Sequence, residues 1–126
     1  MKYRNLGNSD IQVSVIGLGS MTWGHQNSEA DAFSQIEFAL ERGVNLIDTA
    51  EMYPTPSNAE TWGDTERFIG NWLARSKRRH EVVLTSKIVG PPRQNQSRHI
   101  RNGETRHDAR NIVEALNGSL DRLKTD

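Results

Sequence analysis

Short apolar segments alternate with segments of helical periodicity along the chain, and this alternation constrains the fold more than any other feature. Residues 13–19, 44–48 and 81–88 are rich in β-branched, apolar and small residues, which is typical of strands buried on both faces. A segment with helical spacing of its apolar residues follows each of them. Strands that alternate with helices imply parallel strands joined by right-handed crossovers. The sequence therefore predicts the α/β class.

Three helices are expected, one after each strand segment. Ser28 and Asp31 form a relative of the capping box before the first helix, and Gly43 is placed to follow its end. Thr105 and Asp108 are expected to cap the third helix. The apolar faces are predicted to be Phe33, Ile36 and Leu40 in the first helix, Phe68, Ile69, Trp72 and Leu73 in the second, and Ile112, Leu116, Leu120 and Leu123 in the third.

Residues 2–13 precede this alternation and predict a β-hairpin. Two short extended pieces flank a cluster of turn-forming residues at 7–10. Polar loops are expected over residues 51–60 and 91–103. An α/β protein would place a further strand after the last helix, so the chain is expected to be an incomplete piece of its fold.

Composition excludes several classes of function. Formal net charge is zero with acids and bases mixed along the chain, which argues against nucleic acid or an anionic membrane as a partner. There is no cysteine, which excludes disulfides and thiolate metal sites. No run approaches the roughly 20 apolar residues of a membrane span. We therefore expect a soluble, cytoplasmic protein that does not bind nucleic acid or membranes.

Residues 17–19, Gly-Leu-Gly, end the first expected strand and raise the possibility of a dinucleotide-binding Rossmann fold. That fingerprint needs a third glycine where this sequence has Thr22, and its helix begins directly at the glycines. Here the helix is expected only after Ser28. Asp48, an acidic residue that ends the second strand, keeps this alternative open.

Asp48 and Lys87 stand at or near the carboxyl ends of consecutive strands, and Tyr53 follows Asp48 in the loop above the same edge. That edge is where ligands bind in parallel α/β folds. An ammonium close to a phenol favours loss of the phenolic proton, and a carboxylate holds the ammonium in place. Such a phenol can give its proton to a carbonyl oxygen. The alternative is an ion pair that only braces the fold, with Tyr53 an ordinary loop residue.

Five segments resemble the motifs of the aldo-keto reductases. They are residues 18–24, 45–53 and 84–87, the opening residues 3–7 and the closing residues 112–126. The segment Asp-Thr-Ala-x-x-Tyr at 48–53 is the most specific. The resemblance covers nearly the whole chain in order and spacing, and is greatest to bacterial members of the subgroup related to potassium-channel β subunits.

The resemblance implies a partial (β/α)₈ barrel, an N-terminal β-hairpin followed by the first three βα units. Residues 1–126 would then be the incomplete N-terminal part of the barrel domain. The family reduces aldehydes and ketones by hydride transfer from NADPH. By resemblance, Tyr53 would be the proton donor, Lys87 would favour loss of the Tyr53 proton, and Asp48 would form an ion pair with Lys87.

The cofactor and substrate residues also come from the resemblance. Gly19, Ser20 and Met21, together with Asp48, would line the nicotinamide and ribose end of the cofactor site. Trp23 would be a wall of the substrate pocket, or an aromatic residue packed under a loop.

The family's catalytic histidine belongs to a fourth strand, and none of the four histidines here is a convincing substitute. His25, His80, His99 and His107 lie outside the expected strands; a metal bound by His99 and His107 is the weaker alternative, so no metal is expected. An inactive truncated chain, or a regulatory protein that binds a partner, remains the alternative to an enzyme. Unpaired strand edges also predict self-association.

Overall fold

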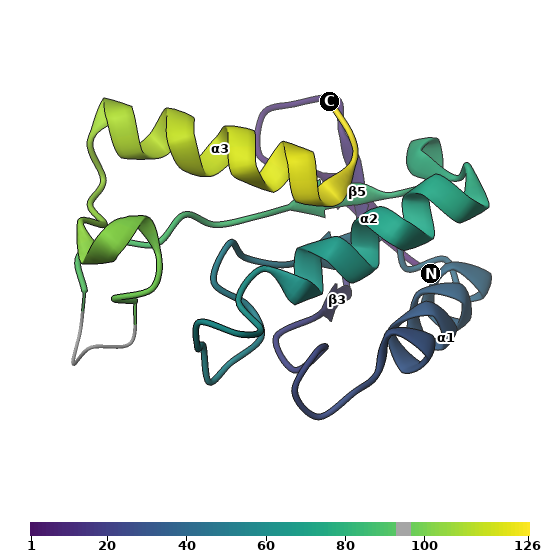
Figure 1. The fold of residues 1–126 in the computed structure, drawn as a ribbon. Helices are drawn as coiled ribbons and strands as arrows, with labels where there is room; N and C mark the ends of the chain where they lie inside the picture. The colour runs from purple at the N-terminus through teal and green to yellow at the C-terminus, as the bar shows by residue number, and fades with distance from the viewer. Residues whose placement is uncertain (93–96) are drawn as a thin grey trace.

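The computed structural model describes residues 1–92 and 97–126, and its elements follow the alternation expected from the sequence (Figure 1). β1 (Tyr3–Asn5) and β2 (Gln12–Ser14) pair as an antiparallel hairpin, as predicted. The parallel sheet has the order β3-β4-β5. Its strands are β3 (Gly17–Gly19), β4 (Leu46–Asp48) and β5 (Val83–Thr85). The helices are α1 (Glu29–Glu41), α2 (Asp64–Ser76) and α3 (Ala109–Leu123), with 3₁₀ turns at Arg79–Glu81 and Arg101–Gly103.

The strands are shorter than predicted. The apolar run 13–19 is divided between β2 and β3, and Val15 and Ile16 between them are 48% and 57% exposed. The chain turns there because the Ser14 hydroxyl donates to the Ile16 carbonyl and the Val15 N–H donates to the Lys2 carbonyl. Hydropathy alone does not reveal such a turn inside an apolar run.

α1 and α2 form the core against the sheet through the faces that the sequence predicts. Ser28 and Asp31 form a complete capping box at α1, and Gly43 follows its end with a φ of +77°. The buried cluster combines residues of β4 and of all three helices with Trp23 and with Val82, which precedes β5. Its members are Trp23, Ala32, Ile36, Ile47, Ile69, Trp72, Leu73, Val82 and Leu123.

α3 packs only partly through the predicted face. Leu123 is buried in the core and Leu120 is half-buried, as predicted, but Ile112 and Leu116 are 43% and 51% exposed. The other buried positions are Asn111, Ala115 and Ser119. These mostly small side chains let α3 approach α2 closely. A Cβ on Gly70 of α2 would lie 2.2 Å from the Arg122 carbonyl oxygen, so only glycine fits there. Asp108 caps α3 by accepting from the Asn111 N–H, while Thr105 is buried beside Ser97 and takes no part in the cap.

α2 lies between α1 and α3 on the sheet (Figure 1). Over residues 1–92 and 97–126, β3 and β5 each have one paired edge, the arrangement on which the expectation of self-association depends. Within the same residues, no helix is both long and apolar enough to cross a membrane.

Candidate active site

The register of the parallel sheet brings three strand ends to one level. Gly19 pairs with Asp48, and Asp48 pairs with Thr85. Asp48 is therefore the last residue of β4, and Lys87 lies two residues beyond the end of β5. The Ser20 N–H and hydroxyl both donate to the Asp48 carbonyl, at 3.1 and 2.7 Å, which ties the chain after β3 to the end of β4.

Lys87 and Asp48 form an ion pair at this edge. The Lys87 Nζ lies 2.7 Å from Asp48 Oδ2 and also donates to the Thr49 carbonyl at 2.6 Å. The Thr85 hydroxyl donates to the other Asp48 oxygen at 3.0 Å. The two charged side chains are 47% and 48% exposed. A pair this exposed contributes about 0–1 kcal/mol, so bracing the fold is a weak reason for its presence.

Tyr53 joins this pair. The Lys87 Nζ lies 5.0 Å from the centroid of the Tyr53 ring, within the range of a cation–π contact. The backbone fixes Tyr53 through two bonds: its N–H donates to the Ala50 carbonyl, and its carbonyl accepts from the Gly63 N–H at 2.8 Å. The three residues that the sequence singled out are therefore neighbours in space.

A cavity of about 380 Å³ opens beside Tyr53 and Lys87. Its lining comes from the segment after β4 and from the chain between β5 and α3. The lining residues are Ala50, Met52, Tyr53, Lys87, Ile88, Val89, Gly90, Pro91, Ser97 and His107. Most of the residues that line the cavity are apolar and few are polar, as in most sites for small organic ligands.

His107 is a lining residue that sequence reasoning left without a role. A Cβ on Gly90 would stand 2.8 Å from the His107 Nε2, so the absence of a side chain at Gly90 lets the imidazole rest on the backbone. His107 precedes the cap of α3 by one residue, and its place at the cavity depends on how the chain returns from β5. No local pattern in the sequence signals this position.

Trp23 does not line this cavity. It is 1% exposed, belongs to the core cluster and donates from its indole N–H to Gln35 Oε1 at 2.9 Å. The structure shows Trp23 packed in the core, the second of the two roles considered for it, and a place in the substrate pocket of the longer protein stays a prediction. Its bulk and a partner for its N–H explain the burial.

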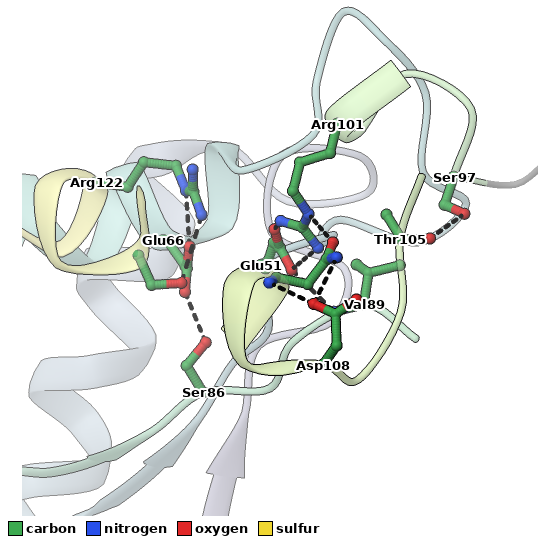
Figure 2. Close-up of polar contacts among 11 residues, drawn as sticks. Glu51, Glu66, Ser86, Val89, Ser97, Arg101, Thr105, Asp108 and Arg122 are labelled. Carbon is green, nitrogen blue, oxygen red and sulfur yellow. Dashed lines mark hydrogen bonds and ion pairs between the residues drawn. The ribbon is translucent and has the colours of Figure 1, made fainter. Parts of the chain in front are cut away.

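Two buried glutamates were also missed. Glu51 is 1% exposed and forms an ion pair with Arg101, and Glu66 is fully buried and accepts from Arg122 Nε at 2.7 Å and from the Ser86 hydroxyl at 2.6 Å (Figure 2). Both carboxylates keep their charge partner inside the protein, as buried charges require. Only the placement of Glu51 between the apolar neighbours Ala50 and Met52 hints at burial in the sequence.

The structure also bears on two alternatives. α1 begins at Glu29, ten residues after Gly19, so the Gly-Leu-Gly turn does not adjoin a helix N-terminus as a Rossmann phosphate site requires. Among residues 1–92 and 97–126, no three His, Asp or Glu side chains converge as metal ligands would. His99 Nε2 instead lies 2.9 Å from the Ser57 hydroxyl.

The chain is similar to known proteins in both sequence and structure. The model of the aldo/keto reductase family matches residues 15–126. The chain is 49% identical over 126 residues to protein tas of Escherichia coli, and covers 36% of that protein. It is 37% identical over 128 residues to the uncharacterized oxidoreductase YrpG of Bacillus subtilis, and covers 37% of it.

Among solved structures, aldo-keto reductase AKR11C1 from Bacillus halodurans, in its holo form, superposes on the whole chain with a TM-score of 0.76 at 33% identity. The chain covers 37% of that structure, and so spans little more than a third of the length of these relatives. The fold is that of a partial (β/α)₈ barrel, and the family match extends over most of the sequence. The chain belongs to the aldo/keto reductase family.

Proposed function

We propose that the protein containing residues 1–126 reduces aldehydes and ketones by hydride transfer from NADPH, with Tyr53 as the proton donor. The contact of Lys87 with both Asp48 Oδ2, at 2.7 Å, and the Tyr53 ring, at 5.0 Å from its centroid, carries this proposal. All three groups stand at the carboxyl ends of parallel strands, beside a cavity large enough for a small carbonyl compound.

The end of β3 fits the cofactor that the family implies. Nothing lies within 4 Å of where a Cβ on Gly19 would stand, so a flat ring can approach the backbone there. Met21 is 48% exposed beside it, and Ser20 holds the ends of β3 and β4 together through the Asp48 carbonyl. Gly19, Ser20, Met21 and Asp48 are the residues proposed to hold the nicotinamide and its ribose.

NADPH, when bound, supplies the hydride that reduces the carbonyl carbon. Tyr53 gives its phenolic proton to the carbonyl oxygen, which becomes the hydroxyl of the alcohol. Lys87 stabilises the phenolate that Tyr53 then becomes, because the ammonium carries the opposite charge. Asp48 holds Lys87 in place through an ion pair that the Thr85 hydroxyl also orients.

Replacing Tyr53 by phenylalanine tests the proton transfer. In the full-length protein, Tyr53→Phe is expected to lower carbonyl-dependent NADPH oxidation by about 10²-fold or more, the usual scale for a general acid. The dissociation constant of NADPH, measured by fluorescence titration, is expected to stay the same. The same titration with NADH tests the cofactor preference.

The chain offers a matched control in its other tyrosine. Tyr3 lies in the hairpin, where its hydroxyl donates to the Gly43 carbonyl at 2.7 Å, and Tyr3→Phe is expected to keep normal turnover. A Tyr53→Phe protein that kept most of its turnover would refute the role of Tyr53. NADPH binding without reduction of any aldehyde or ketone would favour the regulatory alternative.

A further inference from the structure

Residues 97–107, called here the wall segment, belong to the chain between β5 and α3 and reach the cavity at both of their ends. The wall segment contributes Ser97 and His107 to the lining. Within it, the Arg101 side chain turns back toward the chain after β4 and pairs with Glu51 (Figure 2). The two side chains are only 10% and 2% exposed.

The pair makes two further hydrogen bonds besides the contact between its own two side chains. Two nitrogens of the Arg101 guanidinium donate to the two oxygens of Glu51, the second at 3.3 Å. Its Nε donates to Asn111 Oδ1 at 2.9 Å, in the first turn of α3, and Glu51 Oε2 also accepts from the Val89 N–H at 2.8 Å. A planar, two-pronged contact of this kind fixes orientation as well as distance. One guanidinium therefore joins the segment after β4, the segment after β5 and the start of α3.

The two residues of this pair are close in sequence to residues that line the cavity, and Glu51 is also bonded to one of them. Glu51 stands between Ala50 and Met52, both of which line the cavity, and two residues before Tyr53. Val89, which bonds to Glu51, is itself a lining residue, and Arg101 lies between Ser97 and His107 along the chain. Neither Glu51 nor Arg101 is among the lining residues. The ion pair stands behind the wall and holds residues that face the ligand space.

We infer that Arg101, acting through Glu51, is a positioning residue that sets the distance between Tyr53 and the wall segment, and so the affinity for the carbonyl substrate. Burying two charges brings little or no net stability compared with an apolar pair. What the charged pair adds is a fixed distance and orientation between the chain segments that it joins. This inference rests on the proposed reduction, since it concerns the same cavity.

Kinetics of the full-length protein test the inference. Arg101→Gln and Glu51→Gln are each expected to raise the KM of a reducible aldehyde about tenfold, while kcat changes less than about threefold, because the wall moves and the proton donor does not. Arg101→Lys should recover part of the loss, since it keeps the charge without the two-pronged contact. The Glu51→Gln/Arg101→Gln double variant should be no worse than either single variant, because the two residues act as one unit.

Arg122→Gln is the matched control. It removes an arginine of similar burial from an ion pair whose partners Glu66, Ser86 and Ser119 do not line the cavity. Assayed at a temperature where the variant stays folded, it is expected to leave KM unchanged. A second readout needs no turnover: amide hydrogen exchange over residues 97–107 should quicken selectively in Arg101→Gln, and not in Arg122→Gln.

The results of these measurements distinguish a failure of the inference from a failure of the proposed function. Unchanged KM in folded Arg101→Gln, or exchange in the wall segment equal to the native rate, would overturn the inference. Multiplying effects in the double variant would mean that Arg101 contacts the substrate itself, which also overturns it. Failure of the native protein to reduce carbonyls, or full activity in Tyr53→Phe, would instead remove the proposed function, and hydrogen exchange would still decide the role of Arg101.

Discussion

Among residues 1–92 and 97–126, two buried glutamate–arginine pairs are alike in chemistry and different in place. Glu66 with Arg122 and Glu51 with Arg101 each combine a carboxylate that is at most 2% exposed with a guanidinium that is 10–12% exposed. Glu66 and Arg122 belong to α2 and α3, with Ser86 as a third partner. Glu51 and Arg101 belong to the segments that follow β4 and β5, outside the long helices and strands.

This difference decides what each pair controls. Helices keep their shape through their own backbone bonds, so the pair between α2 and α3 fixes how two rigid bodies pack. The segments around Glu51 and Arg101 lack such a ladder, and depend on side-chain contacts for their position. Losing the first pair is therefore expected to cost mainly stability. Losing the second is expected to cost mainly the geometry of the cavity.

The largest expected effect on stability is that of Arg122→Ala. The change leaves the Glu66 carboxylate fully buried with the Ser86 hydroxyl as its remaining partner, and such broken pairs usually cost about 3–5 kcal/mol of unfolding free energy. Urea unfolding of the full-length protein measures the loss. Arg101→Ala is expected to cost less, because its segment can open locally without separating the helices.

A double replacement provides the control for this prediction. Glu66→Leu with Arg122→Met removes both charges, and should recover much of the stability lost in Arg122→Ala. Equal losses of stability in Arg122→Ala and Arg101→Ala would remove the distinction between the two pairs.

The contact of α2 with α3 gives the next effect. In Gly70→Ala the new Cβ would lie 2.2 Å from the Arg122 carbonyl oxygen and 2.8 Å from the Leu123 carbonyl carbon, so α3 has to move. Overpacking of this kind costs about 1–3 kcal/mol, again measured by urea unfolding.

Gly118→Ala in α3 is the matched change. Its nearest neighbour would be a terminal nitrogen of the Arg122 side chain, at 3.1 Å, instead of the backbone of a facing helix, and alanine favours helix by about 1 kcal/mol over glycine. Stability within about 1 kcal/mol of the native protein is expected. A Gly70→Ala protein as stable as Gly118→Ala would show that the close approach of α2 and α3 is not needed.

The helices, the sheet edge and the loops differ in how far the sequence predicts them. The faces of α1 and α2 follow from the spacing of large apolar residues, and Asp48 and Lys87 are neighbours because parallel strands end at one level. The face of α3 follows only at its end, where Leu123 is buried. Its other inward positions include the small residues Ala115 and Ser119, while the more hydrophobic Ile112 and Leu116 lie outside.

The contact of Glu51 with Arg101 was beyond prediction for another reason. The two residues are 50 positions apart, in segments without periodicity, and their meeting depends on the path of two loops. Trp23 was ambiguous because a large aromatic side chain suits a pocket wall and a core equally well. Sequence patterns therefore locate the catalytic candidates on the sheet, and miss the residues that hold the wall segment.

The smallest expected effect lies at a second contact between the two loops. His99 Nε2 is 2.9 Å from the Ser57 hydroxyl, and burial holds the pKa of His99 below its usual value of 6.5 because the charged imidazole is disfavoured there. The unfolded chain then binds a proton more readily, so the contribution of His99 to stability is complete above about pH 6.5 and is lost as the pH falls toward the folded-state pKa.

His99→Asn removes this titration. The urea midpoint of the native protein should therefore fall more between about pH 7.5 and 5 than that of the variant, by a smaller margin than either change at α2 and α3. Identical pH profiles for the two proteins would mean that burial at this contact does not shift the pKa of His99, and that the His99–Ser57 contact adds no pH dependence to stability.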